Sequence, residues 1–247
     1  MHPRVRLVLL AAAIVAFALL VIGLVGRPLS AGTDPSGFAV EAMHALGVPG
    51  VSAAYIQEDG TVSRHAAGMA PEGRFLIASV SKTMTALAVM QLVEDGRLEL
   101  ESRVADVLPV PDDQGAGPVT VRQLLAHASG ISNSAGLVFT TRELRANGFR
   151  VLRELELTAP PGAELIYSNL NYRILGIMVE EISGLSLSRY LHREVFAPLG
   201  MDRTDTARDL HGLGEVVPGH TQILGLNVPV SWTKGLAEVA SGGVIST

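Results

Sequence analysis

An uncharged, strongly apolar run at residues 7–26 most constrains what this chain can fold into. As a helix, a run of this length is about 30 Å long, which matches the hydrocarbon core of a bilayer. Arginines precede the run and a polar linker at residues 27–37 follows it, so we expect a cytoplasmic N-terminus and an exported body. We predict an uncleaved anchor at residues 1–26. A cleaved signal peptide is the alternative, although its nearest candidate site has the large Leu29 at the outer position.

The overall composition excludes several classes of function. The chain has 247 residues, 48% of them hydrophobic, which suffices for one sizeable core or two packed lobes. Its formal net charge of −5 and the lack of a basic stripe argue against a nucleic-acid partner. The absence of cysteine excludes disulfides and thiolate chemistry. The histidines form no His-x-x-x-His cluster and there is no glycine-rich phosphate loop, so we expect neither a metal nor another cofactor.

The order of patterns in residues 38–247 predicts one α/β (α+β) domain. A short amphipathic helix at 38–46 is followed by a hairpin at 51–68 and by an apolar helix at 74–96 that a glycine ends. This order indicates an antiparallel sheet flanked by helices, with an inserted all-helical lobe. A two-stranded sheet is barely stable alone, so more strands are needed, but we find no pattern for them. The helices of the lobe are expected at residues 119–130, 141–157, 171–184 and 185–200.

A lysine stands in the most apolar part of this domain. Lys82 is the only charged residue between positions 75 and 93, and Lys234 is the only other lysine in the chain. Ser79 precedes Lys82 by three positions, which places both side chains on one face at the start of a helix. A desolvated amine can share a proton, as arginine cannot, and so can activate a serine nucleophile. The alternative is that Ser79 or Ser81 caps the helix while Lys82 reaches the surface.

Five segments follow one another along the domain: FLIASVSKTMTALAVMQLVEDGRLELESRVADVLP, VTVRQLLAHASGIS, PPGAELIYSNLNYRILGIMVEEISG, VFAPLGMDRT and SGGVIST. In this order they resemble the serine β-lactamase and penicillin-binding-protein superfamily, and most closely its class C β-lactamase-like branch. The resemblance covers roughly residues 38–247, and it implies a β-lactamase/transpeptidase-like fold.

The resemblance also implies a role for each candidate residue. Ser79 would be the nucleophile that forms an acyl-enzyme, and its backbone N–H would be half of the oxyanion hole. Lys82 would hold and relay the proton of Ser79. Tyr167 would be the general base toward Ser79 and later toward water. Asn169 would hydrogen-bond the substrate and orient Lys82, whereas we expect His127 to secure a turn rather than to act in catalysis.

One family motif is not found in the chain. The family carries Lys or His, then Ser or Thr, then Gly, on a strand after SGGVIST. Here Thr233–Gly235 has related letters in another order, and it comes before SGGVIST. We therefore expect that the C-terminal part of the domain is missing, that the oxyanion hole is half built and that the chain folds poorly.

These observations predict a membrane-anchored, extracytoplasmic serine hydrolase. Its substrate would be an amide or ester, which leaves a β-lactam, a D-Ala peptide and a small ester open. Its partners would be this substrate and, through the N-terminal helix, the cell membrane. The alternative location is outside the cell, after secretion and cleavage of the signal. The alternative function is a non-catalytic relative that binds peptidoglycan or peptide, or an inactive truncated product.

Overall fold

The computed structural model describes residues 35–68, 73–134, 140–207, 216–223, 226–230 and 238–247. The predicted anchor at residues 7–26 lies outside this part of the chain, and so does Thr233–Gly235. Within the described part, no helix has both the length and the apolar character needed to cross a bilayer. The chain divides into two compact units, Met1–Gly73 with Pro218–Ser231, and Arg74–Val217 with Trp232–Thr247.

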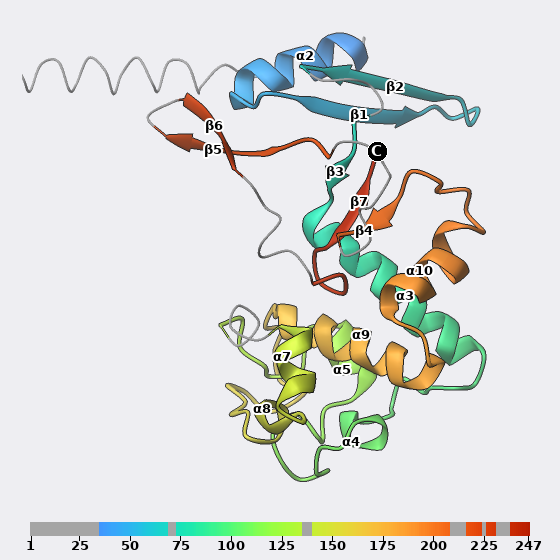
Figure 1. Cartoon of the computed structure of the whole chain (residues 1–247), viewed down its shortest axis with the longest axis vertical. Helices are drawn as coiled ribbons and strands as arrows, with labels where there is room; N and C mark the ends of the chain where they lie inside the picture. Colours follow the sequence, from blue (N-terminus) through green and yellow to red (C-terminus); the bar gives the residue numbers. More distant parts are fainter. Residues whose placement is uncertain (1–34, 69–72, 135–139, 208–215, 224–225, 231–237) are drawn as a thin grey trace, which may run out of the picture. The chain divides into compact units, whose positions relative to one another are not determined.

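The described residues of the first unit form one helix and two antiparallel strand pairs (Figure 1). The predicted helix and hairpin are confirmed: α2 spans Pro35–Leu46, and β1, Val51–Ile56, pairs antiparallel with β2, Val62–Ala67. A second antiparallel hairpin joins β5, Gly219–Ile223, to β6, Leu226–Val230, and sequence patterns had not indicated it. An isolated two-stranded hairpin buries little apolar surface, so the stability of each hairpin depends on the elements that pack against it.

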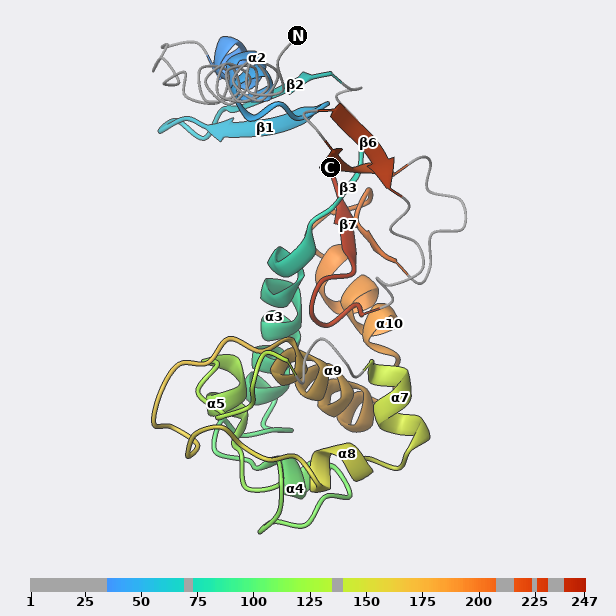
Figure 2. The ribbon, with the colours of Figure 1, turned by 90° about the vertical axis from the view of Figure 1, so that its left-hand side faces the viewer.

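The second unit contains a three-stranded antiparallel sheet. Its central strand is β7, Val244–Ser246, which pairs with β3, Phe75–Leu76, on one side and with β4, Asp205–Thr206, on the other. Figures 1 and 2 both show β7 beside β3 where the chain enters helix α3, Ser81–Glu94. The expectation that the sequence supplies no further strands is therefore wrong. Strands of two or three residues are too short to display the alternation that reveals longer ones.

The predicted helix at residues 74–96 is three successive elements. Strand β3 is followed by a 3₁₀ turn, η1, at Ala78–Val80, and then by helix α3 at Ser81–Glu94. The helix ends where expected, because Gly96 has a φ of 68° and takes the left-handed conformation that suits a C-terminal cap.

Helix α9, Asn169–Ser183, is the central helix of the second unit and confirms the helix predicted at 171–184. Most of its residues are buried, and Gly184 ends it with a φ of 73°. Glycine inside a helix costs about 1 kcal/mol relative to alanine. Here a Cβ on Gly176 would lie 2.7 Å from the Cβ of Ala240, so glycine permits a close approach of α9 to the C-terminal segment.

The run predicted as one helix at residues 141–157 is two short helices. These are α7, Thr141–Ala146, and α8, Arg150–Arg153. Between them Gly148 and Phe149 have φ values of 60° and 61°. An α-helix cannot continue through left-handed residues, so the prediction of a single helix is wrong.

Two further helices are shorter than predicted. The pattern at residues 119–130 forms only α5, Val121–Leu125, since His127 has a φ of 54° and leaves the helical conformation. The pattern at residues 185–200 forms a short α-helix followed by a π-helical segment. These two segments are α10, Leu187–Leu191, and η2, His192–Phe196. The described part also contains the short helix α4, Val104–Val107.

Candidate active site

The turn before α3 presents Ser79 to solvent. Ala78, immediately before it, has a φ of 45°, which costs an L-residue about 1–2 kcal/mol. Ser79 lies in η1 and is exposed, whereas Ser81 and Lys82, at the start of α3, are buried. Neither η1 nor α3 has a side-chain cap, so Ser79 and Ser81 do not serve as helix caps. A strained turn next to an exposed hydroxyl is typical of functional sites.

Three predicted residues meet at this turn. The hydroxyl oxygens of Ser79 and Tyr167 lie 2.8 Å apart, although 88 positions separate the two residues. Lys82 Nζ donates to Ser79 Oγ at 3.3 Å. The Lys82 side chain is only 6% exposed, so the alternative in which it reaches the surface is wrong.

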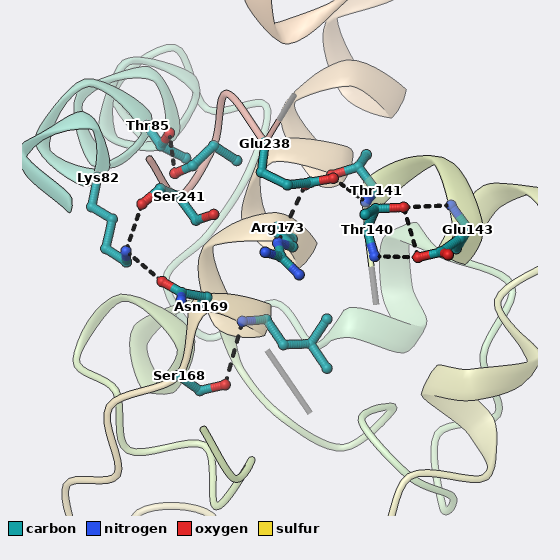
Figure 3. Close-up of polar contacts among 12 residues, drawn as sticks. Lys82, Thr85, Thr140, Thr141, Glu143, Ser168, Asn169, Arg173, Glu238 and Ser241 are labelled. Atoms are coloured by element: carbon teal, nitrogen blue, oxygen red, sulfur yellow. Dashed lines mark hydrogen bonds and ion pairs between the residues drawn. The ribbon is translucent and has the colours of Figure 1, made fainter. Parts of the chain in front are cut away.

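Lys82 Nζ has two further acceptors. Asn169 Oδ1 accepts at 2.8 Å, and the backbone carbonyl of Ser241 accepts at 2.7 Å (Figure 3). An ammonium has three N–H donors, and together with Ser79 Oγ these oxygens supply one acceptor for each. The amine is therefore held in one position beside the Ser79 hydroxyl.

Ser168, between Tyr167 and Asn169, is the N-cap residue of α9. Ser168 is extended, with φ −143° and ψ 130°, and its Oγ accepts from Leu170 N as the N-cap of α9. Tyr167 is thus the last residue before the cap, and Asn169 is the first residue of the helix. The cap explains why a Tyr-Ser-Asn sequence delivers two functional side chains from one short stretch.

The environment of Tyr167 favours its ionised form. Burial raises the pKa of the Tyr167 phenol, but hydrogen bonding from Lys82 and Ser79 and the positive charge of Lys82 together lower it below 10.0. The Lys82 ammonium lies 5.0 Å from the centre of the Tyr167 ring. A phenol with a lowered pKa, in contact with a serine hydroxyl, is suited to accept its proton.

The ring of His127 lies beside that of Tyr167, and it accepts a hydrogen bond from the backbone N–H of the next residue, Ser168. Burial, followed by the charge of Lys82, lowers the pKa of His127. Its Nδ1 accepts from the Ser168 N–H at 3.2 Å, and Asn171 Nδ2 lies at the same distance. The ring proton of the neutral imidazole is therefore on Nε2. These contacts fit the expectation that His127 secures a turn.

Sequence reasoning missed the part that Ser241 contributes. The segment at residues 238–244 lies along α3: Thr85 Oγ1 donates to the Ala240 carbonyl at 2.9 Å, and Val244 N donates to Ser81 Oγ at 3.0 Å. Ser241 contacts Lys82 through its backbone carbonyl, which every residue type possesses. Its side chain therefore gives no signal, and the tight Gly242–Gly243 turn was the only visible indication.

The arrangement can carry out nucleophilic catalysis. A hydroxyl, a base in contact with it and an oriented cation are the parts that activate a serine.

Within the described ranges, no group of three or more His, Asp or Glu side chains could hold a metal ion.

Comparison with known families and proteins agrees with this geometry. The family model described as Beta-lactamase matches residues 37–247. Penicillin-binding protein 4 of Amycolatopsis lactamdurans is 36% identical over 173 residues, which are 64% of this chain and 45% of that protein. Protein flp of Staphylococcus aureus strain COL is 33% identical over 140 residues, 54% of this chain and 28% of that protein. The chain thus spans less than half the length of these curated relatives.

Solved structures show the same fold. The octameric penicillin-binding protein homologue from Pyrococcus abyssi aligns with a TM-score of 0.72 at 30% identity, covering 85% of this chain and 52% of that one. The D-stereospecific amidohydrolase from a Streptomyces species aligns with a TM-score of 0.69 at 27% identity, covering 84% of this chain and 67% of that one. The fold is therefore of the mixed α/β, β-lactamase/transpeptidase-like type, with antiparallel sheets and helices.

Proposed function

Because this chain belongs to the beta-lactamase family, we propose that it is a serine hydrolase that forms an acyl-enzyme at Ser79 on an amide or ester substrate. The observation that carries the proposal is the contact of Ser79 Oγ with both the Tyr167 hydroxyl and the Lys82 amine, at 2.8 Å and 3.3 Å. The resemblance to the class C-like branch supports Tyr167, rather than a carboxylate, as the base.

In the first half-reaction, Ser79 Oγ attacks the substrate carbonyl carbon while its proton passes to Tyr167. The carbonyl oxygen becomes an oxyanion, toward which the Ser79 N–H would donate. As the bond to the leaving group breaks, Tyr167 returns the proton to that group, which departs as an amine or alcohol. Lys82 stabilises the phenolate before Tyr167 takes the proton and after Tyr167 gives it up, since the hydrogen bond from Lys82 and its positive charge both lower the pKa of Tyr167.

In the second half-reaction, Tyr167 takes a proton from water, and the hydroxide attacks the acyl carbon. The acid product leaves, and the proton returns to Ser79 Oγ. Asn169 would hydrogen-bond the substrate as well as hold Lys82, from which it lies 2.8 Å.

The substrate we propose is a β-lactam, a D-Ala peptide or a small ester. The similar proteins include a penicillin-binding protein and a D-stereospecific amidohydrolase, which support an amide next to a D-configured centre. The hydrolase domain would comprise residues 38–247, after the linker at 27–37. The apolar run at 7–26 would anchor it in the cell membrane with the domain outside the cytoplasm.

Active-site labelling tests the proposal. The full chain is treated with a fluorophosphonate and with fluorescent penicillin, and wild type is compared with Ser79→Ala and Ser63→Ala. Ser63 lies in β2, in the other unit, and serves as the control. We expect labelling of wild type and Ser63→Ala by at least one probe, and none of Ser79→Ala. Equal labelling of all three proteins would remove Ser79 from the role of nucleophile, and labelling of none would favour a non-catalytic ligand-binding relative.

A further inference from the structure

A buried carboxylate holds the segment that contacts Lys82. Glu238 is only 7% exposed, and its own backbone carbonyl accepts from the amides of Ser241, Gly242 and Gly243 at 3.0–3.1 Å. These three bonds close the chain into a tight turn. The residue that begins the turn therefore fixes the position of the Ser241 carbonyl, which accepts from Lys82.

The side chain of Glu238 ties this turn to two helices. Its carboxylate accepts from Thr141 N at 2.9 Å and from Thr141 Oγ1 at 2.6 Å, at the first residue of α7. Arg173 Nε, in α9, lies 3.3 Å from it, and Arg173 is only 8% exposed (Figure 3). A buried charge is tolerated only when it is paired and hydrogen-bonded, so all three contacts are needed together.

The same turn contacts α3 next to the site. The Ala240 carbonyl accepts from Thr85 Oγ1, and the next carbonyl along the chain, that of Ser241, accepts from Lys82 Nζ. Ala240 also packs against Gly176 of α9. A shift of the turn would therefore move an acceptor of the Lys82 amine directly.

We propose that Glu238 is a positioning residue for Lys82: its carboxylate, held by Thr141 and Arg173, sets the Ser241 carbonyl that aims the amine at Ser79 and Tyr167. The inference rests on the proposed function for its effect on catalysis. Its structural part, the placement of the Lys82 amine, is independent of activity.

Three variants and one control separate this role from general stability. Thr141→Val removes one donor to Glu238 and keeps the shape of the side chain, whereas Thr141→Ser restores the hydroxyl. Glu238→Gln removes the charge. Arg145→Gln is the control, because Arg145 also joins α7 to α9, through Glu180 and Glu181, without contacting the turn.

Lysine-selective NMR measures the position of the amine without any need for activity. The chain has two lysines, so lysine labelling gives two side-chain signals, and Lys234→Arg assigns them. We expect the Lys82 signal to move in Thr141→Val and Glu238→Gln, and to stay in place in Thr141→Ser and Arg145→Gln. Unchanged signals in Thr141→Val, or equal changes in Arg145→Gln, would overturn the proposal. Thr141→Val keeps the test decisive if Glu238→Gln does not fold.

The rate of Ser79 labelling measures the consequence. A small misplacement far from the reacting atoms can cost up to about 100-fold, so we expect about a tenfold slower reaction in Thr141→Val and a larger loss in Glu238→Gln. Thr141→Ser should regain the wild-type rate, and Arg145→Gln should retain it. Equal rates in Thr141→Val and Arg145→Gln would overturn a role in catalysis.

The pH profile supplies a readout that a purely structural role would not move. The lowered pKa of Tyr167 depends on Lys82, so displacing the amine raises that pKa and shifts the acidic limb of labelling to higher pH. His127 and Tyr172 also lie near this group, and neither variant touches them. If wild type is not labelled while the Lys82 signal responds, the proposed function fails and the placement of Lys82 by Glu238 stands.

Discussion

The two units of the chain differ in how their apolar side chains are used. In the second unit, α9 buries ten of its residues, and the side chains of Leu175 and Ile177 are fully inaccessible. In the first unit, β1 and β6 leave large apolar side chains exposed: Ile56 is 69% exposed and Leu226 is 70% exposed. Every candidate catalytic residue belongs to the second unit. Placing three side chains within hydrogen-bond distance requires a packed core beneath them, and among the described residues the buried hydrophobic cluster lies in the second unit.

The largest expected effect comes from changing Lys82, at the centre of the packed unit. Lys82→Arg keeps the charge, but the planar fork of the guanidinium does not match the three acceptors of the amine. We expect labelling of Ser79 to slow by about 10²–10⁴-fold. Thermal unfolding of the same variant serves as control, and a rate near that of wild type would contradict the role of Lys82.

Removing the phenol tests the base. Tyr167→Phe should slow labelling by about 10²–10⁴-fold, because the Ser79 proton loses its acceptor. In wild type the reactive form is the phenolate, so the rate should rise with pH through a midpoint below 10.0, the ordinary pKa of tyrosine. This rise should be absent from the variant. A profile that is the same in both proteins would assign the titration to another group.

Truncations in the two units test the comparison directly. Leu175→Ala opens a cavity in α9, and we expect it to lower the free energy of unfolding by about 2–5 kcal/mol. Ile56→Ala, on exposed β1, should change it by less than about 0.5 kcal/mol. Denaturant unfolding measures both. Equal losses would show that the side chain of Ile56 is buried in solution, and the contrast between the units would be withdrawn.

The smallest effect is expected at the strained turn. Ala78→Gly relieves the strain of a φ of 45°, which favours the folded state by about 1–2 kcal/mol. The greater freedom of glycine in the unfolded chain offsets about 0.4–1 kcal/mol of this, so we expect a net gain in stability of at most about 1 kcal/mol. Thermal unfolding measures the gain. Exposed Gly60, in the hairpin of the first unit, has a φ of 84°, and Gly60→Ala should have the opposite sign. A loss of stability in Ala78→Gly would show that the turn is not strained.

Patterns of composition and spacing predicted the longer elements well. The hairpin at 51–68 and the helix at 171–184 were both found, because each repeats its apolar period several times and ends at a glycine. The three-residue strand β7 and the break at Gly148–Phe149 were missed. Two or three residues carry too few repeats to define a period, and long-range pairing decides their conformation.

The sequence by itself determined which residues could perform the chemistry: the spacing of Ser79 and Lys82 indicated two of them, and the resemblance of the Tyr-Ser-Asn stretch to a family motif added Tyr167 and Asn169. The fold then brings these four side chains together. Only the tertiary structure decided how the amine is held. Ser241 contributes a backbone carbonyl, and Glu238, 156 positions after Lys82, acts through a turn of the main chain. Backbone groups are the same at every residue, so their partners are set by packing and leave no trace in the pattern of side chains.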